Sequence, residues 1–273
     1  MAHYDESRLK EIARQSRIDV IKMLAQSKSG HPGGSLSEIE ILVALFAEEM
    51  KHDPKNPTMP ERDRFVLSKG HGIPGQYAVM AQEGYWPRED MLTLRMADSM
   101  FQGHPDRVRV DALEASTGSL GQGLSIAVGY AIAAKLDKTS SRTYCLIGDG
   151  ESQEGQIWEA AMSAPKFALD NLVCILDYNK AQIDGYVKDV MPLEPIADKW
   201  EAFGWHVISI DGHDYDQIFN AFDNARSTKG KPTFILADTV KGKGVSFMEG
   251  LVDWHGKAPS QEQAKQALAE LGA

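Results

Sequence analysis

Cysteine is scarce in this sequence, which contains only Cys145 and Cys174 among its 273 residues. Each cysteine stands inside a short apolar run that resembles a buried strand, so we interpret both as small core side chains in a reducing compartment. No CxxC, HxxH or HxxxH spacing occurs that would indicate a zinc site. These features argue against a disulfide-stabilised secreted domain and against a structural zinc domain.

Positive charge and long apolar runs are also in short supply. Lysine and arginine total 29 against 39 aspartates and glutamates, and the net charge of −10 argues against nucleic acid or an anionic membrane as the main partner. No apolar run approaches the roughly 20 residues that span a bilayer. The first ten residues, MAHYDESRLK, are polar and unlike a signal peptide. We therefore expect a cytoplasmic protein, with His3 in a mobile terminus.

A strand, a helix and a second strand are predicted between residues 143 and 184. The apolar run Tyr144–Ile147 stops at a Gly-Asp-Gly sequence, and the run Leu172–Leu176 ends in Asp-Tyr-Asn. Between them, helical spacing relates four apolar residues: Ile157, Ala160, Ala161 and Ala164. Such a connection makes the strands parallel and the crossover right-handed, and ligands collect at the carboxyl ends of such strands. Asp149 and Asn179 are therefore expected to face one crevice.

These two side chains suit a magnesium ion held together with a diphosphate. Mg²⁺ takes about six oxygen ligands and commonly binds one or two protein groups together with phosphate oxygens and water. We predict Asp149, Asn179 and the backbone carbonyl of Ala181 as metal ligands, with Ca²⁺ or Mn²⁺ as substitutes. Gly148 and Gly150 are expected to let the backbone turn sharply, and the helix after them to point its free N–H groups at a phosphate.

The remaining pattern extends this unit into a doubly wound α/β fold, with a mostly parallel sheet and helices on both faces. Further strands are predicted at Arg64–Leu67, Val207–Ile210 and Thr233–Asp238. Further helices are predicted at Arg8–Ser27, Ser35–Met50 (opened by a capping box from Ser35 to Glu38), Gln76–Gln82, Arg88–Ala97, Leu120–Leu136, Pro192–Ala202 (with a connection), Asp214–Arg226 and Gln261–Leu271. No repeat or linker interrupts the pattern, so residues 1–273 are expected to form one domain with a helical N-terminal arm.

Four of the eight histidines are followed directly by Gly or Pro: His31 in SGHPGGS, His71 in SKGHG, His104 in QGHPD and His255 in WHGKAP. A single loop histidine is by default a solvated side chain. Four in the same setting indicate imidazoles that are presented to one pocket, where a pKa near neutrality would suit proton transfers at hydroxyl groups. His52, His206 and His213 lack this setting, and we assign them no role.

Another glycine cluster, Thr117 to Gly123, stands directly before a predicted helix. Its spacing is not the GxGxxG of a dinucleotide fold, and no Walker A sequence occurs in the chain. Two interpretations stay open: packing glycines at a helix start, or a backbone wall against a flat cofactor.

Taken together, SGHPGGSLS, LSKGH, GHP, TGSLGQG, GDG…N and WHGKAP resemble, in order and approximate spacing, the N-terminal diphosphate-binding domain of transketolases. The resemblance covers nearly the whole chain and implies a thiamine diphosphate-binding fold with Mg²⁺. It implies cofactor contacts from His71, Gly118, Ser119, Leu120, Gly150, Glu151, Asn179 and His255. It also implies catalytic roles at the sugar oxygens for His31, His104 and His255, and a subunit-interface position for Glu154.

Full-length transketolases continue into a pyrimidine-binding domain and a C-terminal domain, and nothing here matches those. The resemblance therefore implies the N-terminal subunit of a split transketolase, which transfers a two-carbon ketol unit from a ketose (phosphate) donor to an aldose acceptor. The activating glutamate and the substrate phosphate ligands would lie on a separate C-terminal subunit. We expect a dimer of this chain within an α2β2 heterotetramer, no activity of the isolated chain, and an apolar interface around Gly118–Gly129 and Glu154–Trp158.

Other functions are also compatible with parts of this pattern. The α subunit of a 2-oxoacid dehydrogenase shares GDG…N, but the SGHPGGS and SKGHG histidines argue against it. Deoxyxylulose-phosphate synthase is normally one long chain. A non-catalytic cofactor-binding or regulatory domain, which kept the fold and lost activity, is the remaining alternative; intact Asp149, Asn179, His71 and His255 argue against such decay. Among donors, xylulose 5-phosphate, a sulfonated sugar and a branched-chain pentulose would be distinguished by the partner.

Overall fold

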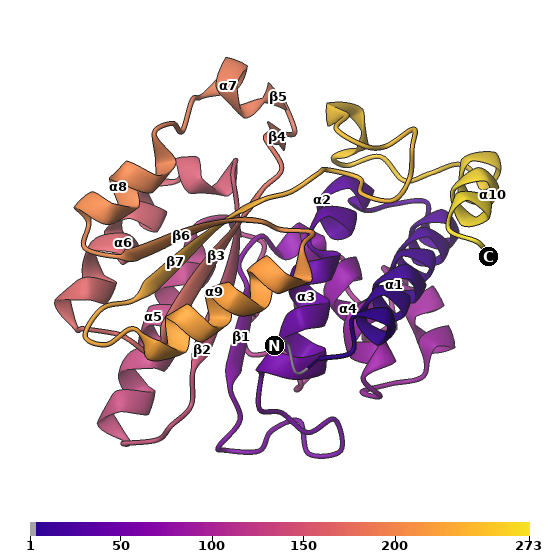
Figure 1. Ribbon diagram of the computed structural model, residues 1–273. Coiled ribbons are helices and arrows are strands. Elements are labelled where there is room, and N and C mark those ends of the chain that lie inside the picture. Colours follow the sequence, from indigo (N-terminus) through magenta and orange to yellow (C-terminus); the bar gives the residue numbers. More distant parts are fainter. Residues whose placement is uncertain (1–3) are drawn as a thin grey trace.

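A five-stranded parallel sheet forms the centre of the computed structural model, which describes residues 4–273; His3 lies outside the described residues. The strand order is β1-β2-β3-β7-β6. Their bounds are β1 Arg64–Leu67, β2 Thr143–Gly148, β3 Leu172–Tyr178, β6 His206–Asp211 and β7 Thr233–Asp238. After β3 the chain runs to the edge of the sheet as β6 and returns as β7 beside β3, so the direction of winding reverses there (Figure 1).

Alternate strand residues face opposite sides of the sheet, and each side has its own apolar core. Tyr144 and Leu146 of β2 belong to the core under one set of helices, whereas Cys145 and Ile147 belong to the core under the other. The first core is covered by α1 (Glu6–Ser27), α3 (Ile39–Ala44), α4 (Ile73–Gln82) and α9 (Tyr215–Ser227). The second is covered by α5 (Gln122–Leu136), α6 (Gly155–Lys166) and α8 (Ile196–Ala202). The predicted doubly wound α/β class is confirmed.

Both cysteines are free and fully buried, on neighbouring strands. Burial raises the pKa of each thiol, so both are unreactive core side chains, as predicted. The four apolar residues predicted to share one face of the central helix are all buried in α6.

The predicted capping box from Ser35 to Glu38 was wrong. The helix begins earlier, as α2 (Pro32–Ser37), with Pro32 in its first turn and the Ser35 hydroxyl donating back to the carbonyl of His31. Glu38 ends α2, and its carboxylate lies 2.6 Å from Nζ of Lys69 instead of capping a backbone N–H. Proline suits the first helical turn because its missing N–H has no partner there, and this signal outweighed the Ser-to-Glu spacing.

Two other predicted helices differ in extent. The segment predicted as a helix from Arg88 to Ala97 forms only a 3₁₀ turn, Arg88–Thr93. The helix predicted directly after Gly-Asp-Gly is separated from it by the 3₁₀ turn Glu151–Gln153, and α6 begins at Gly155. The N–H groups that follow Gly-Asp-Gly, where we expected a phosphate to bind, therefore belong to a 3₁₀ turn and not to the start of α6.

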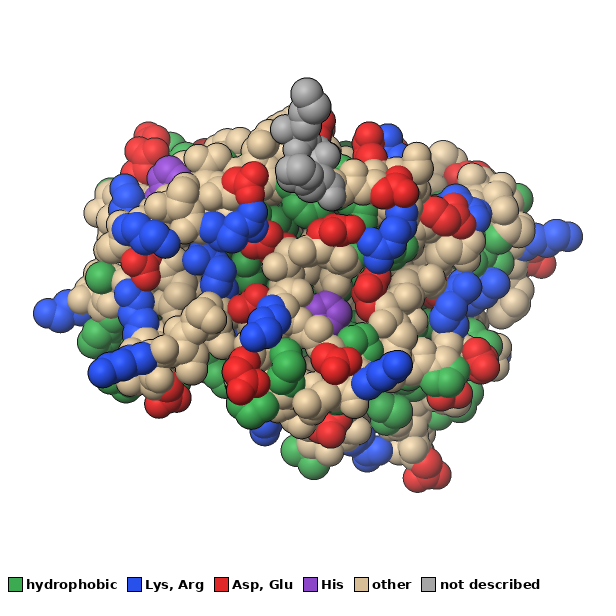
Figure 2. Space-filling model, turned by 60° about the horizontal axis from the view of Figure 1, so that its bottom comes forward, with side chains coloured by type: hydrophobic (Ala, Val, Ile, Leu, Met, Phe, Trp, Pro, Cys, Tyr) green, Lys and Arg blue, Asp and Glu red, His purple; other side chains and the backbone are tan. Residues whose placement is uncertain are grey.

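Several short elements rise above the carboxyl ends of the strands. After β3 come the hairpin strands β4 (Ala181–Gln182) and β5 (Gly185–Tyr186) and the short helix α7 (Val187–Val190) (Figure 1). α10 (Gln261–Glu270) closes the chain beside α1. With the bottom of that view turned forward, acidic and basic side chains are interspersed (Figure 2). Within residues 4–273, no helix combines the length and apolar character needed to cross a membrane.

Candidate active site

Loops at the carboxyl end of the sheet bring four histidines into one cluster. The ring centroid of His31 lies 5.2 Å from that of His71, 5.6 Å from that of His255 and 6.1 Å from that of His104. The rings of His71 and His255 lie 5.0 Å apart. The structure therefore gathers the four histidines that share the Gly/Pro loop setting, while their chemical roles stay predictions.

Burial keeps these imidazoles neutral. It lowers the pKa of His31 to about 4 and that of His255 to about 3, and nearby positive charges act in the same direction. Burial also lowers the pKa of His71 and of His104. The expected near-neutral pKa values were therefore wrong for this state of the protein. Each ring carries one N–H donor and one acceptor nitrogen at pH 7 and can exchange hydrogen bonds with hydroxyl groups without bearing charge.

Glycines allow the histidine loops to approach one another. Gly118 has a φ of +128°, and a Cβ atom there would lie 2.7 Å from Cδ2 of His104. A Cβ atom on Gly70 would lie 2.8 Å from the backbone nitrogen of Gly118. Since both distances are shorter than van der Waals contact, the loops that carry His71 and His104 can meet only through glycine.

Asp149 and Asn179 stand just beyond β2 and β3, where the parallel strands end. Oδ1 of Asp149 accepts the N–H of Gly150 at 2.7 Å, whereas its buried Oδ2 has no hydrogen-bond partner among the described residues. Burial, together with the negative charge of Asp177, raises the pKa of Asp149 to about 6. A buried carboxylate oxygen that lacks a donor would be stabilised by a cation, so the predicted oxygen ligands fit Mg²⁺.

The other two predicted metal ligands lie close by. Among the described residues, Oδ1 of Asn179 accepts only the N–H of Ala181, at 3.3 Å, which leaves one of its lone pairs without a donor there. The carbonyl of Ala181 accepts from Nζ of Lys241 at 2.9 Å. In the described part of the chain, no three His, Cys, Asp or Glu side chains are grouped so as to hold a metal.

Lys241 is a site residue that sequence reasoning missed. It follows β7, is only 1% exposed, and places Nζ 3.1 Å from Nδ1 of His255. Because an ammonium only donates, Nδ1 of His255 accepts and the ring proton belongs on Nε2. Burial lowers the pKa of Lys241 to about 8, although Asp149 and Asp177 oppose this shift. A lysine in a glycine-rich loop directly after a predicted strand, VKGKG, was the available signal.

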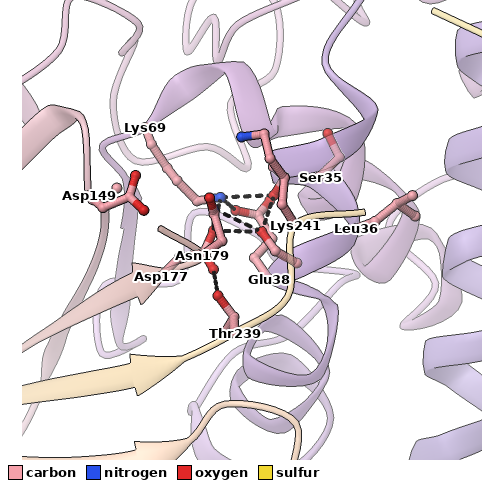
Figure 3. A network of polar contacts seen from close by, with 12 residues as sticks. Ser35, Leu36, Glu38, Lys69, Asp149, Asp177, Asn179, Thr239 and Lys241 are labelled. Atoms are coloured by element: carbon pink, nitrogen blue, oxygen red, sulfur yellow. Dashed lines mark hydrogen bonds and ion pairs between the residues drawn. The ribbon is translucent and has the colours of Figure 1, made fainter. Parts of the chain in front are cut away.

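A second missed feature is a buried set of charges beneath the metal ligands (Figure 3). Nζ of Lys69 donates to Oδ2 of Asp177 at 2.7 Å and to the carbonyl of Gly34 at 2.8 Å, and it also lies 2.6 Å from the Glu38 carboxyl group. Burial alone would lower the pKa of Lys69, but the two carboxylates raise it. Burial raises the pKa of Glu38 to about 8, whereas Lys69 lowers that of Asp177 despite its burial, so the contact between Lys69 and Asp177 is the stronger charge pair. In the sequence Lys69 is 31 residues from Glu38 and 108 residues from Asp177, so these side chains meet only in the folded chain.

Gly150 of the Gly-Asp-Gly sequence makes room for a neighbouring side chain, and neither glycine forms a sharp turn. Neither Gly148 nor Gly150 has a positive φ, so the predicted need for a sharp glycine turn was wrong. A Cβ atom on Gly150 would lie 2.9 Å from the Gln182 side chain, whereas one on Gly148 would meet only ordinary contacts, from 3.5 Å. The glycine at 150 therefore lets the β4 hairpin close over the site.

The remaining predicted residues occupy different environments. The carboxylate of Glu151 is 2% exposed and accepts from the Ser68 hydroxyl and from the N–H groups of Gly121 and Gly148, so it ties three loops together inside the protein. Ser119 is exposed and Leu120 is half-buried at the start of α5. Glu154 is exposed directly before α6, beside Gly121.

Arg95 is a half-buried cation near the histidine cluster that sequence reasoning also missed. Its φ is +63°, its Nη2 donates to the carbonyl of Gly103 at 3.4 Å, and its buried Nε has no partner among residues 4–273. Burial is the main cause of the lowered pKa of His31 and of His104, and the positive charge of Arg95 lowers both values further. A guanidinium with an unsatisfied donor beside neutral imidazoles suits an oxygen-rich or anionic ligand.

Comparison with known proteins identifies what this arrangement resembles. Residues 8–273 match the family described as "Transketolase, thiamine diphosphate binding domain". A 6-deoxy-6-sulfo-D-fructose transketolase subunit of Clostridium sp. strain MSTE9 is 50% identical over 266 residues, covering 96% of this chain and 97% of the relative. An apulose-4-phosphate transketolase subunit of Phocaeicola vulgatus is 42% identical, covering 95% of this chain and 92% of the relative.

A longer transketolase of known structure has the same fold over the matched part. The crystal structure of transketolase from Campylobacter jejuni superimposes with a TM-score of 0.92 at 36% identity. The match covers 98% of this chain but only 43% of that one. The chain thus spans less than half the length of that transketolase and nearly the full length of the two subunit relatives.

Proposed function

This chain belongs to the transketolase family as a thiamine diphosphate-binding N-terminal subunit, and from this premise we propose that, paired with a separate C-terminal subunit, it transfers a two-carbon ketol unit from a ketose to an aldose. The observation that carries the proposal is the convergence of four histidines, Asp149, Asn179 and Lys241 at one end of the sheet. When bound, thiamine diphosphate supplies the electron sink for breaking a carbon–carbon bond beside a ketone.

The oxygen ligands and Lys241 hold the anionic end of the cofactor in this proposal. Asp149, Asn179 and the carbonyl of Ala181 bind Mg²⁺, and the buried ammonium of Lys241 adds positive charge for the diphosphate. The carbonyl of Ala181 accepts from Lys241 at 2.9 Å, so the ammonium lies next to a proposed metal ligand and would be available to the diphosphate. His71, Gly118, Ser119, Leu120, Gly150 and His255 form the surrounding wall, while Glu151 orders the loops from within.

In this proposal the imidazoles orient the sugar, accept a proton from one of its hydroxyl groups and return that proton as imidazolium. His31, His104 and His255 present N–H donors and nitrogen acceptors to hydroxyl and carbonyl oxygens of the substrate. General acid–base groups of this kind typically contribute about 10²–10⁴-fold to a rate. A pKa held low by burial makes each imidazole a weak base in the free chain, and a bound substrate oxygen that bears negative charge would raise it.

The partner subunit covers an apolar face beside the site. α5 contains no charged residue before Lys135, and helices that are apolar on all sides are normally buried. Beside it, Met162 of α6 is 55% exposed and Phe167, after that helix, is 52% exposed. Together with Glu154, this face suits the partner, and we propose an α2β2 heterotetramer in the cytoplasm with the sites at its interfaces.

The donor we propose is a ketose that carries a strong-acid group at its far end. Relatives that are similar along their full length are named for 6-deoxy-6-sulfo-D-fructose and for apulose 4-phosphate, and both compounds fit this description. The greater identity to the first favours the sulfonated ketose. Arg95, half-buried beside the histidines with an unsatisfied Nε, supplies positive charge on this chain for such a substrate.

The test is a donor comparison on the chain assembled with its partner, Mg²⁺ and thiamine diphosphate. The proposal predicts aldose-dependent ketol transfer, with the highest kcat/KM for the sulfonated ketose. A preference for apulose 4-phosphate would correct the donor alone. Decarboxylation of a 2-oxoacid without ketol transfer would replace the proposal by a 2-oxoacid dehydrogenase function.

A further inference from the structure

Asp177 is a buried carboxylate whose close neighbours are hydrogen-bond donors. It is 0% exposed, and its Oδ2 accepts from Nζ of Lys69 at 2.7 Å and from the Ser37 hydroxyl at 2.6 Å. The same oxygen accepts from Nδ2 of Asn179 at 3.1 Å, and its Oδ1 accepts from the Thr239 hydroxyl. A carboxylate paired with an ammonium only accepts hydrogen bonds, so the group that Asn179 presents to it must be the NH₂ group.

This contact decides which end of the Asn179 amide is free. The two ends of an asparagine amide are nearly alike in shape, but only the oxygen can bind a cation. With Nδ2 turned to Asp177, Oδ1 faces away and, within residues 4–273, accepts only the N–H of Ala181, at 3.3 Å. We propose that Asp177 is a positioning residue that holds the amide oxygen of Asn179 toward the metal ligands Asp149 and Ala181.

The fold makes this orientation rigid. Residues two apart on a strand point to the same side, so Asp177 and Asn179 lie next to each other where β3 ends. The donors that hold the carboxylate come from three other segments. Lys69 lies in the loop after β1 and Thr239 in the loop after β7 (Figure 3), and Ser37 belongs to α2. Rotation of the carboxylate would break contacts with several elements at once. The inference rests on the proposed role of Asn179 as a metal ligand.

Replacing either side chain tests the orientation directly. Asp177→Asn removes the anionic acceptor, and residues that orient metal ligands typically change metal affinity about 10–100-fold. Asn179→Asp places two carboxylates side by side and should also weaken binding.

The measurement is binding of Mn²⁺ to the full chain, assembled with its partner, at saturating thiamine diphosphate. The electron paramagnetic resonance signal of free Mn²⁺ gives the affinity without any assay of activity. Glu114→Gln is the matched control because Glu114 forms a buried ion pair with Arg62, at 2.8 Å, outside the site. This variant should lose stability and keep its Mn²⁺ affinity.

Wild-type Mn²⁺ affinity in Asp177→Asn would overturn the inference. Asp149→Ala separates this failure from failure of the proposed function. If Asp149→Ala also leaves the Mn²⁺ affinity unchanged, the metal site itself is wrong; if it abolishes binding, only the positioning role fails. Should circular dichroism show that Asp177→Asn does not fold, Thr239→Val keeps the carboxylate and removes one donor. A severalfold loss of affinity is then expected, and an unchanged affinity would again overturn the inference.

Discussion

Nζ of Lys241, in the loop after β7, donates at 2.9 Å to the backbone carbonyl of Ala181, the first residue of β4. A lysine that is 1% exposed thus contacts an oxygen that the sequence predicts as a metal ligand. This ammonium lies close enough to Asp149 and Asp177 for both carboxylates to raise its pKa, although burial lowers it overall to about 8. Lysine and metal ligands therefore form one electrostatic unit.

Lys241→Met should weaken thiamine diphosphate binding by at least about tenfold, or about 1.4 kcal/mol, at saturating Mg²⁺. The buried positive charge is lost, whereas a methionine of similar length fills the space, so the melting temperature should not fall. Titration calorimetry on the assembled enzyme measures the affinity. Lys243→Met is the matched control, because Lys243 is 38% exposed and lies 3.9 Å from Glu249. Equal affinities for thiamine diphosphate in the two variants would show that Lys241 does not help to bind the cofactor.

Asp149→Ala should abolish magnesium-dependent cofactor binding and leave the fold intact. Its Oδ2 has no partner among residues 4–273, and burial raises its pKa to about 6, so the side chain is poorly stabilised without a cation. The affinity for thiamine diphosphate, measured with and without Mg²⁺, reports the loss. Asp170→Ala removes a carboxylate that pairs with Lys135 before β3, at the opposite end of the sheet, and should have no effect. Affinity within about threefold of wild type, under ~1 kcal/mol, would contradict the ligand assignment.

His31→Ala, His104→Ala and His255→Ala should lower turnover of the assembled enzyme more than they lower stability. Nδ1 of His31 has no hydrogen-bond partner in the described part of the chain, which suits a group that acts on a ligand better than a packing contact. Losses of about 10²–10⁴-fold in kcat are expected where the imidazole transfers a proton. His206→Ala, in β6, is the control. A large fall in melting temperature with normal specific activity of the folded fraction would make these residues structural.

The free energy of unfolding should fall as the pH drops below about 6.5. An unfolded histidine has a pKa near 6.5, whereas burial holds that of His31 at about 4 and that of His255 at about 3. Between these values the unfolded chain binds more protons, so acid favours unfolding. Asp149, with its pKa raised to about 6, acts in the opposite direction. Urea unfolding of the wild type and of His31→Gln at pH 7.5 and at pH 5 isolates the contribution of this histidine. Between these two pH values the variant should lose less free energy of unfolding than the wild type. Identical losses would show that the pKa of His31 is not lowered in the folded chain.

The architecture could be predicted because its signals are local. Short apolar runs gave β1 and β7 at their observed bounds, and 3.6-residue apolar patterns gave α1 and α9 to within two residues at each end. The Ser35–Glu38 capping box failed where two local signals competed, and Pro32 prevailed. The short 3₁₀ turn at Arg88–Thr93 has too little apolar periodicity to separate it from a helix.

The electrostatics of the site could not be predicted in the same way. Glu38, Lys69 and Asp177 come from three distant segments, and only the folded chain shows that one ammonium serves two carboxylates. The low pKa values of the histidines also depend on burial and on the proximity of Arg95 and Lys241, which no spacing in the sequence reveals. The Gly or Pro that follows each of the four histidines identified the side chains that meet in the site, but their ionisation depends on tertiary contacts.

Reconstitution of ketol transfer tests the central claim most directly, that this chain provides one half of a composite transketolase site. The purified 273-residue chain, its separate C-terminal partner and an equimolar mixture of the two are each assayed with Mg²⁺, thiamine diphosphate, a sulfonated ketose donor and an aldose acceptor. The account predicts that neither chain forms product by itself, and that the mixture does so as a complex with the mass of two copies of each chain. Ketol transfer by the purified chain alone would contradict it.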